Sequence, residues 1–269
     1  MSDKDMYYNK AKQQGYRARS AYKLQQLDET AGLLDAGDTV VDLGAAPGGW
    51  MQVAAERVGP DGTVIGVDRQ NISDLEDPEA TVEYIRGDIT EDWTRDQIRE
   101  TVGSSETQRP VDVVISDMAP NMSGEYELDH ARSVHLARQA FDLATELLTA
   151  GGDLAVKVFD GRDLTDLEDE IDEEFEYVRQ VRPDASRESS SELYLVAKNF
   201  LTAPVRPGDR LDVEITDTGE EGDGIARVDG FTLFVADAEE GESYRVEVDD
   251  VKPRFGFATV AEEQPDREE

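Results

Sequence analysis

The sequence of 269 residues contains no cysteine and only two histidines, His130 and His135. The absence of cysteine excludes disulfide bonds, thiolate zinc sites and a cysteine nucleophile. With so few histidines, a metal site or a catalytic triad built on imidazole is not expected, and we predict no bound metal. The two histidines are five positions apart, which is poor spacing for a shared helix face. We therefore expect both to be structural.

Long apolar segments are missing as well. No run approaches the roughly 20 residues that a membrane-spanning helix requires. The first ten residues, MSDKDMYYNK, lack the apolar core of a secretory signal. We expect a cytoplasmic protein that does not associate with membranes, and a monomer by default.

Basic residues are scarce. The 27 lysines and arginines face 62 acidic residues, which gives a formal net charge of −35. Intrinsic disorder is one explanation of such a charge, but the acids are interleaved with regular apolar segments, which favours a folded protein. We interpret the excess as adaptation to a high-salt cytoplasm, where dissolved ions screen the repulsion between surface carboxylates.

The first 200 residues alternate short apolar strands with amphipathic helices. This alternation predicts an α/β fold, a Rossmann-like, doubly wound parallel sheet of seven strands whose last two are joined as in a hairpin. A helix from about Ala18 to Ala31 is expected before the first strand. The expected strands cover residues 39–43, 63–68, 82–88, 111–117, 153–159, 176–183 and 192–199.

The pattern changes after residue 200. Five short strands follow, separated by glycine and aspartate turns with no helix between them, which predicts a small all-β barrel of the OB type over residues 201–262. We expect the boundary in the proline-containing linker Thr202–Gly208. The acidic residues 263–269 are expected to form a disordered tail.

Three polar features converge at the carboxyl edge of the predicted sheet, where α/β proteins bind ligands. The segment DLGAAPGGW (residues 42–50) is a glycine-rich turn that lets the backbone approach a ligand. Asp68 ends the second strand and suits a ribose diol, while Asp88 follows the third and suits an adenine amino group. Because GAAPGG lacks the G-x-G-x-x-G phosphate motif, a nucleoside without pyrophosphate fits better. S-adenosylmethionine is such a ligand, and its sulfonium suits an acidic cleft.

Four segments resemble one family in order. DLGAAPGGW, SDMAPNMSG (residues 116–124), VKVFDG (residues 156–161) and SRESSSELYLVA (residues 186–197) are similar to the RrmJ/FtsJ (RlmE) family of ribose 2′-O-methyltransferases. The resemblance covers residues 1–200. It implies methyl transfer from S-adenosylmethionine to a uridine ribose of large-subunit (23S) ribosomal RNA, and therefore ribosomal RNA or the large subunit as partner.

The resemblance also implies roles for individual residues. The cofactor positions of the family match Gly48, Trp50, Asp68, Asp88 and Asp117. Its catalytic Lys-Asp-Lys-Glu tetrad matches Lys23, Asp117, Lys157 and Glu192. The segments EEGDGIARVDGFTLFVADA and SYRVEVDDV, with GFATV after them, resemble a TRAM domain, a small RNA-binding barrel. This match is looser, because it rests on glycine spacing and strand rhythm.

Methyl transfer needs a base that accepts the proton of the 2′-hydroxyl, and we predict that Lys157 is this base. A lysine accepts a proton only when it is neutral, and burial and a nearby cation favour the neutral form. Lys157 lies inside the apolar strand DLAVKVF, which predicts burial, and Lys23 supplies the second cation. Taken singly, each residue also has an ordinary explanation: Lys157 or Glu192 at the surface, Asp117 in a turn, Trp50 in the core.

One basic segment stands out against the acidic background. From Met6 to Leu27 there is no acid, and KAKQQGYRARSAYK (residues 10–23) carries five cations. We predict that Lys10, Lys12, Arg17 and Arg19 contact RNA phosphates. Two other functions stay open: a ribose methyltransferase acting on tRNA or another RNA, and a non-catalytic RNA-binding assembly factor, against which the intact tetrad argues.

Overall fold

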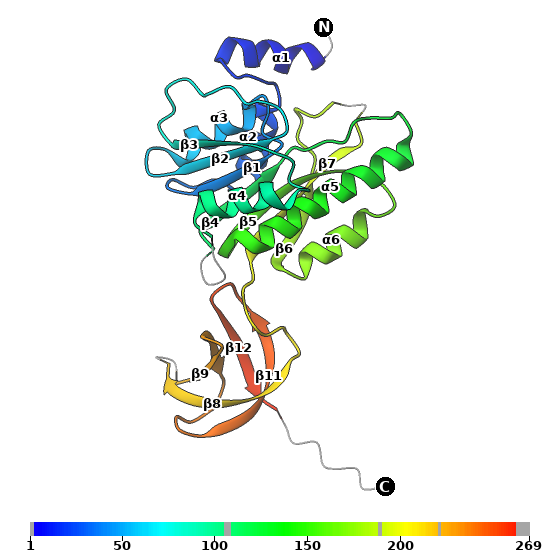
Figure 1. The fold of residues 1–269 in the computed structure, drawn as a ribbon. Coiled ribbons are helices and arrows are strands. Elements are labelled where there is room, and N and C mark those ends of the chain that lie inside the picture. The colour runs from blue at the N-terminus through cyan, green and yellow to red at the C-terminus, as the bar shows by residue number, and fades with distance from the viewer. Residues whose placement is uncertain (1–2, 105–108, 188–189, 220–221, 262–269) are drawn as a thin grey trace. The chain divides into compact units, whose positions relative to one another are not determined.

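The computed structural model describes residues 3–104, 109–187, 190–219 and 222–261 (Figure 1). The predicted tail, residues 263–269, lies outside these ranges. The chain divides into two compact units, Met1–Phe200 and Leu201–Glu269. None of the helices in the described ranges combines the length and apolar character needed to cross a membrane.

The first unit is a seven-stranded sheet in the order β3-β2-β1-β4-β5-β7-β6, with helices on both faces. The predicted α/β fold is confirmed. The first five strands are parallel, and β7 runs antiparallel to both β5 and β6, so the sheet is mixed. The strands are β1 Thr39–Leu43, β2 Thr63–Asp68, β3 Thr81–Arg86, β4 Val111–Ser116, β5 Leu148–Phe159, β6 Phe175–Val181 and β7 Glu192–Phe200.

Two apolar layers separate the helices from the sheet. Residues of α2 and α3 pack on one face, and residues of α4, α5 and α6 pack on the other. The central strands are therefore buried on both sides, as the apolar runs of β1 and β4 require. The helices are α1 Asp3–Gln14, α2 Ala21–Ala31, α3 Gly49–Val58, α4 Asp92–Val102, α5 Tyr126–Leu147 and α6 Leu164–Asp172.

The basic N-terminal segment forms two helices rather than the single predicted one. The expected helix over residues 18–31 is present as α2 from Ala21 onward, but α1 was not predicted, because its residues show almost no amphipathic pattern. Gly15, with φ of 81°, separates the two helices. The Tyr7 and Tyr22 rings, with centroids 5.5 Å apart, pack α1 onto α2.

The second unit is a closed five-stranded barrel in the order β10-β12-β11-β8-β9. The predicted OB-like barrel is confirmed. Alternate residues of each strand fill a small apolar interior, including Leu233, Val235 and Val246. Its strands are β8 Arg210–Thr218, β9 Gly224–Val228, β10 Phe231–Val235, β11 Ser243–Val251 and β12 Phe255–Val260.

Candidate active site

The sheet topology brings the four tetrad residues to one place. Asp117 directly follows β4, Lys157 lies in β5, Glu192 begins β7, and Lys23 comes from α2, which packs on the same face of the sheet. Ser116 pairs with Val156, so Asp117 lies beside Lys157 in register. Lys157 pairs with Tyr194 and Phe159 with Glu192, so Lys157, Tyr194 and Glu192 point to the same face.

The tetrad side chains form a continuous chain of ion pairs. Lys157 Nζ lies 2.8 Å from Asp117 Oδ1 and also donates to the Asp117 main-chain carbonyl. Lys23 Nζ lies 2.7 Å from Glu192 Oε1 and 3.8 Å from Asp117 Oδ1. All four side chains are at most 18% exposed. The cluster is therefore two cations and two anions with little access to water, and the predicted burial of Lys157 is confirmed.

Tyr194 is a fifth member that we did not predict. Its hydroxyl donates to Asp117 Oδ1 at 2.6 Å, and its ring lies 5.8 Å from Lys23 Nζ. Burial, then Asp117 and Glu192, raise the pKa of Tyr194 well above its usual value, so the phenol stays protonated. From the sequence alone, a tyrosine in an apolar strand is predicted to be a core residue. Only its register opposite Lys157 reveals the contact.

Asp117 is held in its ionised form. Burial alone would raise the pKa of this carboxyl, but the charges of Lys157 and Lys23 and the hydrogen bonds from Lys157 and Tyr194 outweigh burial and lower it. An ionised Asp117 can orient the ammonium or amine of Lys157 at all pH values near neutrality.

The glycine-rich turn between β1 and α3 is tightly built. Gly44, with φ of 80°, has no room for a Cβ, which would lie 2.6 Å from Met118 Cγ. Gly48, with φ of 104°, caps the start of α3. Asp68 braces the turn, because its carboxylate accepts the Ala46 N–H at 3.0 Å. The turn therefore presents backbone close to the end of β2, next to the carboxylate of Asp68.

Asp42 is the second residue that sequence reasoning missed. It lies in β1 between Gly66 and Ile115, is completely buried, and neither of its carboxylate oxygens has a hydrogen-bond partner among the described residues. Burial, and then Asp117 and Asp68, raise its pKa well above the usual value. A buried acid without a partner is costly, and a cationic ligand would remove that cost. The signal in the sequence was an acid in an otherwise apolar strand.

The other predicted cofactor residues lie on the same rim of the sheet or close to it. Asp88 follows β3, and its carboxylate accepts the backbone N–H and the hydroxyl of Thr90. Trp50 is buried in the core: its indole donates to the Ser20 carbonyl at 2.8 Å and its ring packs near Tyr194. Any contact of Trp50 with a cofactor would therefore come from its backbone in the first turn of α3.

The four cations predicted to contact RNA occupy different environments. Lys10 and Lys12 are exposed on α1, and Lys10 Nζ lies 4.5 Å from the centre of the Tyr22 ring. Arg19 is partly buried and donates to the Ala185 carbonyl at 3.3 Å. The two lysines are thus the members of this set most open to a phosphate.

Arg17 is engaged within the α/β unit. Its guanidinium donates to the carbonyls of Pro47, Ser73 and Asp74, and so joins the glycine-rich turn to the loop after β2. A Cβ on Gly48 would lie 2.9 Å from Arg17 Nη1. The arginine therefore lies against the turn that the sequence assigns to the cofactor.

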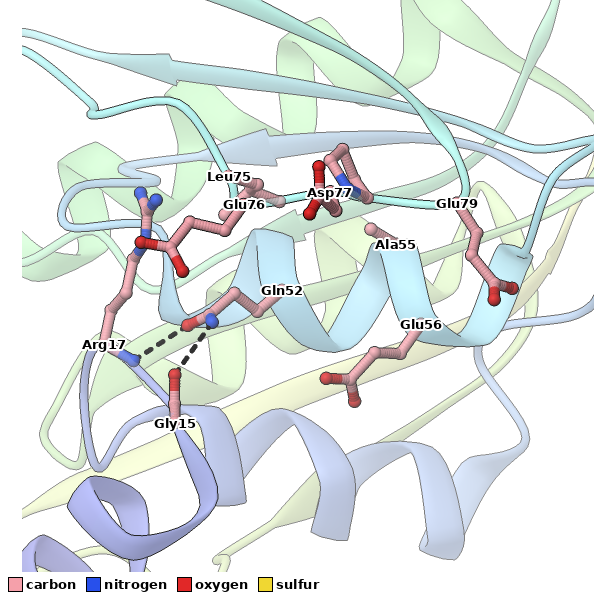
Figure 2. Close-up of a pocket in the computed structure, with 10 residues that line it drawn as sticks. Gly15, Arg17, Gln52, Ala55, Glu56, Leu75, Glu76, Asp77 and Glu79 are labelled. Carbon is pink, nitrogen blue, oxygen red and sulfur yellow. Dashed lines mark hydrogen bonds between the residues drawn. The ribbon is translucent and has the colours of Figure 1, made fainter.

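A cavity of about 490 Å³ opens beside Arg17 (Figure 2). Gln52 of α3 forms part of its wall, accepting the Arg17 N–H at 2.8 Å and donating to the Gly15 carbonyl at 3.1 Å. The remaining wall is largely acidic, with Glu56, Glu76, Asp77 and Glu79. None of the tetrad side chains lines it, so this cavity is separate from the candidate active site.

His130 of α5 lies beside the end of β5. His130 is buried, its Nδ1 lies 2.9 Å from the Phe159 carbonyl, and its Nε2 accepts the Asp163 N–H. It therefore holds the loop after β5, a structural role as predicted. Within the described residues, no group of three or more histidines and carboxylates is arranged to bind a metal ion.

The two units match the profiles of two different families. The profile of the FtsJ-like methyltransferase family matches residues 16–200, and that of the TRAM domain matches residues 204–261. "Ribosomal RNA large subunit methyltransferase E" of Haloarcula marismortui is 71% identical over 97% of this chain and 100% of its own length. The protein of the same name from Methanothrix thermoacetophila is 47% identical over 96% of this chain and 97% of its own.

A crystal structure gives a similar result for the first unit. A Plasmodium falciparum protein described as a ribosomal RNA methyltransferase superposes with a TM-score of 0.59 at 27% identity. The match covers 69% of this chain and 98% of that one. Almost all of the Plasmodium falciparum chain therefore corresponds to a part of this chain that is too short to include both units.

Proposed function

The chain belongs to the FtsJ-like methyltransferase family, and we propose that it transfers a methyl group from S-adenosylmethionine to the 2′-hydroxyl of a uridine in large-subunit ribosomal RNA. The observation that carries the proposal is the buried, mutually paired cluster of Lys23, Asp117, Lys157 and Glu192. The names of the relatives support the RNA class. From this proposed substrate we also infer a location in the cytoplasm, with the ribosomes.

The carboxyl edge of the sheet fits the cofactor. The backbone at Gly48, which has no side chain, would lie against the cofactor. The carboxylate of Asp68 would accept hydrogen bonds from the ribose hydroxyls, and that of Asp88 would accept one from the adenine amino group. The orphaned carboxylate of Asp42 fits a cationic group of the same ligand, because a positive charge there would offset the burial of the acid. When bound, S-adenosylmethionine supplies an electrophilic methyl on a sulfonium.

The tetrad manages the proton of the attacking hydroxyl. Lys157 in its neutral form would accept that proton as the new oxygen–carbon bond forms and the methyl–sulfur bond breaks, which leaves a methylated ribose, a neutral thioether in place of the sulfonium, and a protonated Lys157. Asp117 fixes the position of Lys157 through its carboxylate and its main-chain carbonyl. Glu192 holds Lys23, whose positive charge would stabilise the developing negative charge on the ribose oxygen.

RNA docking involves both units in this proposal. Lys10 and Lys12 on α1 contact phosphates beside the active site, and the barrel binds a further part of the RNA. Arg19 adds to this surface. Arg17 contributes through the loops that it joins, because its donors are already directed at three carbonyls.

Methyl transfer in vitro tests the function directly. The protein, tritiated S-adenosylmethionine and large-subunit RNA that lacks the modification would be combined at molar KCl. We expect tritium in alkali-resistant dinucleotides, because a 2′-O-methyl group blocks strand cleavage at its own position. Parallel reactions with protein-free RNA, assembled large subunits and tRNA identify the form of the substrate.

Three results would contradict the proposal. Tritium on a base rather than a ribose would exclude the chemistry, and label confined to tRNA would exclude the substrate. RNA binding without any methyl transfer to the three RNAs would favour a non-catalytic assembly factor instead.

A further inference from the structure

Two loops of the α/β unit meet at the end of β2, beside the proposed cofactor site. The first is the glycine-rich turn between β1 and α3, and the second is the loop that follows Asp68. Asp68 joins them, because its carboxylate accepts the Ala46 N–H of the turn at 3.0 Å and the Gln70 N–H of the loop at 2.7 Å. The position of this carboxylate therefore depends on how the turn and the loop lie relative to each other.

Arg17 forms a second link between the same turn and the same loop. Its Nη1 donates to the Pro47 carbonyl of the turn at 3.3 Å and to the Ser73 carbonyl of the loop, and its Nη2 donates to the Asp74 carbonyl. Nη1 lies so close to the turn that a Cβ on Gly48 would be 2.9 Å from it. A planar guanidinium, whose donors have a fixed geometry, can join carbonyls of two chain segments in this way.

The loop after β2 has few buried residues that could hold it in place. Between Ile72 and Ala80 none of its residues is buried, and this stretch contains no helix or strand. The Leu75 N–H donates to the Tyr84 hydroxyl at 2.7 Å. Residues 75–79 line one wall of the cavity of about 490 Å³, and α3 contributes to the opposite wall (Figure 2). A segment with so few buried contacts depends strongly on its remaining hydrogen bonds.

Arg17 is itself held against the turn by residues of α3. The Gln52 side chain accepts the Arg17 N–H at 2.8 Å and donates to the Gly15 carbonyl at 3.1 Å. Gly49, the first residue of α3, has little room for a side chain, since a Cβ there would lie 3.2 Å from Ala18 Cβ. The backbone on both sides of Arg17 is therefore packed on α3, which fixes the point from which the guanidinium reaches the loop.

We propose that Arg17 is a positioning residue for the cofactor, which holds the loop after β2 at the distance from the glycine-rich turn that S-adenosylmethionine requires. The inference rests on the proposed function for the identity of the ligand. It gives Arg17 a different role from Lys10 and Lys12, whose side chains are exposed on α1. Without the hydrogen bonds of Arg17, the loop and Asp68 would have to be ordered by the cofactor itself, and this ordering would weaken binding.

Arg17→Lys tests the proposal, because lysine keeps the positive charge but loses the planar set of donors. Calorimetry with the full-length protein at molar KCl measures the affinity for S-adenosylmethionine. We expect roughly 5- to 30-fold weaker binding, the range for losing one or two intramolecular hydrogen bonds. RNA affinity, measured by filter binding, should stay close to that of the wild type. Unchanged cofactor affinity would overturn the proposal, and so would a loss of RNA affinity alone, which would assign Arg17 to a phosphate.

Arg57→Lys is the matched control. Arg57 lies in the last turn of α3, at the end away from the glycine-rich turn, and pairs with Asp28 at 2.9 Å. Its replacement should leave cofactor affinity unchanged, and equal losses in the two variants would overturn the role of Arg17. In Arg17→Lys the KM for S-adenosylmethionine should rise while kcat at saturating cofactor stays constant. A lower kcat with an unchanged KM would indicate partial unfolding and overturn the proposal.

Hydrogen exchange in the cofactor-free protein observes the loop directly. Amides of residues 69–76 should exchange faster in Arg17→Lys than in the wild type, and those of β5 should not change. Equal exchange of the loop in both proteins would overturn the proposal. If the wild type bound S-adenosylmethionine but transferred no methyl to ribosomal RNA, the proposed function would fail. Weaker cofactor binding by Arg17→Lys would then still support the positioning role.

Discussion

The tetrad and the phenylalanine cluster of the barrel (Phe234, Phe255 and Phe257) differ in whether they carry charge and in whether they are exposed to solvent. The tetrad encloses four charged groups, pairs them and shields them from water, so their field acts on one proton. On the barrel, by contrast, the rings of Phe255 and Phe257 of β12 are exposed, uncharged and packed edge to face. In a chain of net charge −35, the tetrad keeps two lysines buried and paired, whereas these rings meet the solvent without any charge of their own.

The largest effect is expected from a variant that lacks the proton acceptor but still binds RNA. Lys157→Ala should lower kcat by about 10²–10⁴-fold, the contribution of a positioned general base. RNA affinity should stay unchanged, as measured by filter binding. Lys198→Ala is the matched control, since Lys198 is also a strand lysine paired with a buried carboxylate, Asp153, but lies outside the tetrad. Equal kcat losses in both variants would show a general effect of removing a strand lysine.

Removing the barrel should have the opposite signature. A chain ending at residue 200 should bind ribosomal RNA about tenfold or more weakly and still bind S-adenosylmethionine, because the cofactor residues all lie in the first unit. The Plasmodium falciparum structure supports an α/β unit that folds without a barrel. Calorimetry with the cofactor and filter binding with RNA measure the two effects. Unchanged RNA affinity in the shortened chain would show that the barrel does not contribute to RNA binding.

Asp42→Asn sharpens the comparison inside the first unit, by replacing a buried carboxyl that has no hydrogen-bond partner among the described residues with a group that cannot ionise. The variant should melt about 2 °C higher or more at neutral pH, the shift given by about 1 kcal/mol in a domain of this size. It should also bind S-adenosylmethionine more weakly, since the anion that fits a cationic ligand is gone. Differential scanning fluorimetry and calorimetry measure these two changes.

The pH dependence of that variant has a defined sign. The folded-state pKa of Asp42 is raised, so the folded wild type loses stability as pH rises from the unfolded value near 4 up to the folded pKa. Asparagine does not titrate, so the stability advantage of the variant should grow across that interval and then level off. A constant difference at every pH would exclude Asp42 as its source.

The smallest expected effect is that of Tyr194→Phe. This change removes one of the hydrogen bonds that lower the pKa of Asp117, so that pKa should move upward. The acid limb of the kcat profile should therefore shift to higher pH, with a rate loss of less than about tenfold at neutral pH. A fall in kcat with an unshifted acid limb would indicate a packing role for the ring.

Much of this arrangement could be predicted from the sequence, because it depends on strand order. An apolar run around Lys157 indicates burial, and acids at strand ends meet at one edge of a parallel sheet. The seven strands and the barrel also followed from periodicity. The sheet was predicted to be parallel, and only the close connection between the last two strands indicated an antiparallel pair; the antiparallel pairing of β7 with β5 was not predicted.

The features that could not be predicted depend on atoms without a sequence signature. Arg17 donates to three backbone carbonyls, and carbonyls are the same in every residue. The orphaned state of Asp42 depends on having Gly66 and Ile115 as register neighbours. The predicted phosphate contacts of Lys10, Lys12 and Arg19 stay predictions, since exposure permits them without specifying a partner.

The pairing of Lys23 with Glu192 has a consequence for the timing of synthesis. The two partners are 169 positions apart, so at about 5–20 residues per second the second is added roughly 10–30 s after the first. A nascent chain stopped anywhere before β7 lacks both Glu192 and the strand that carries it. The ion pair that completes the tetrad therefore cannot form until the ribosome has added β7, which is near the end of the first unit.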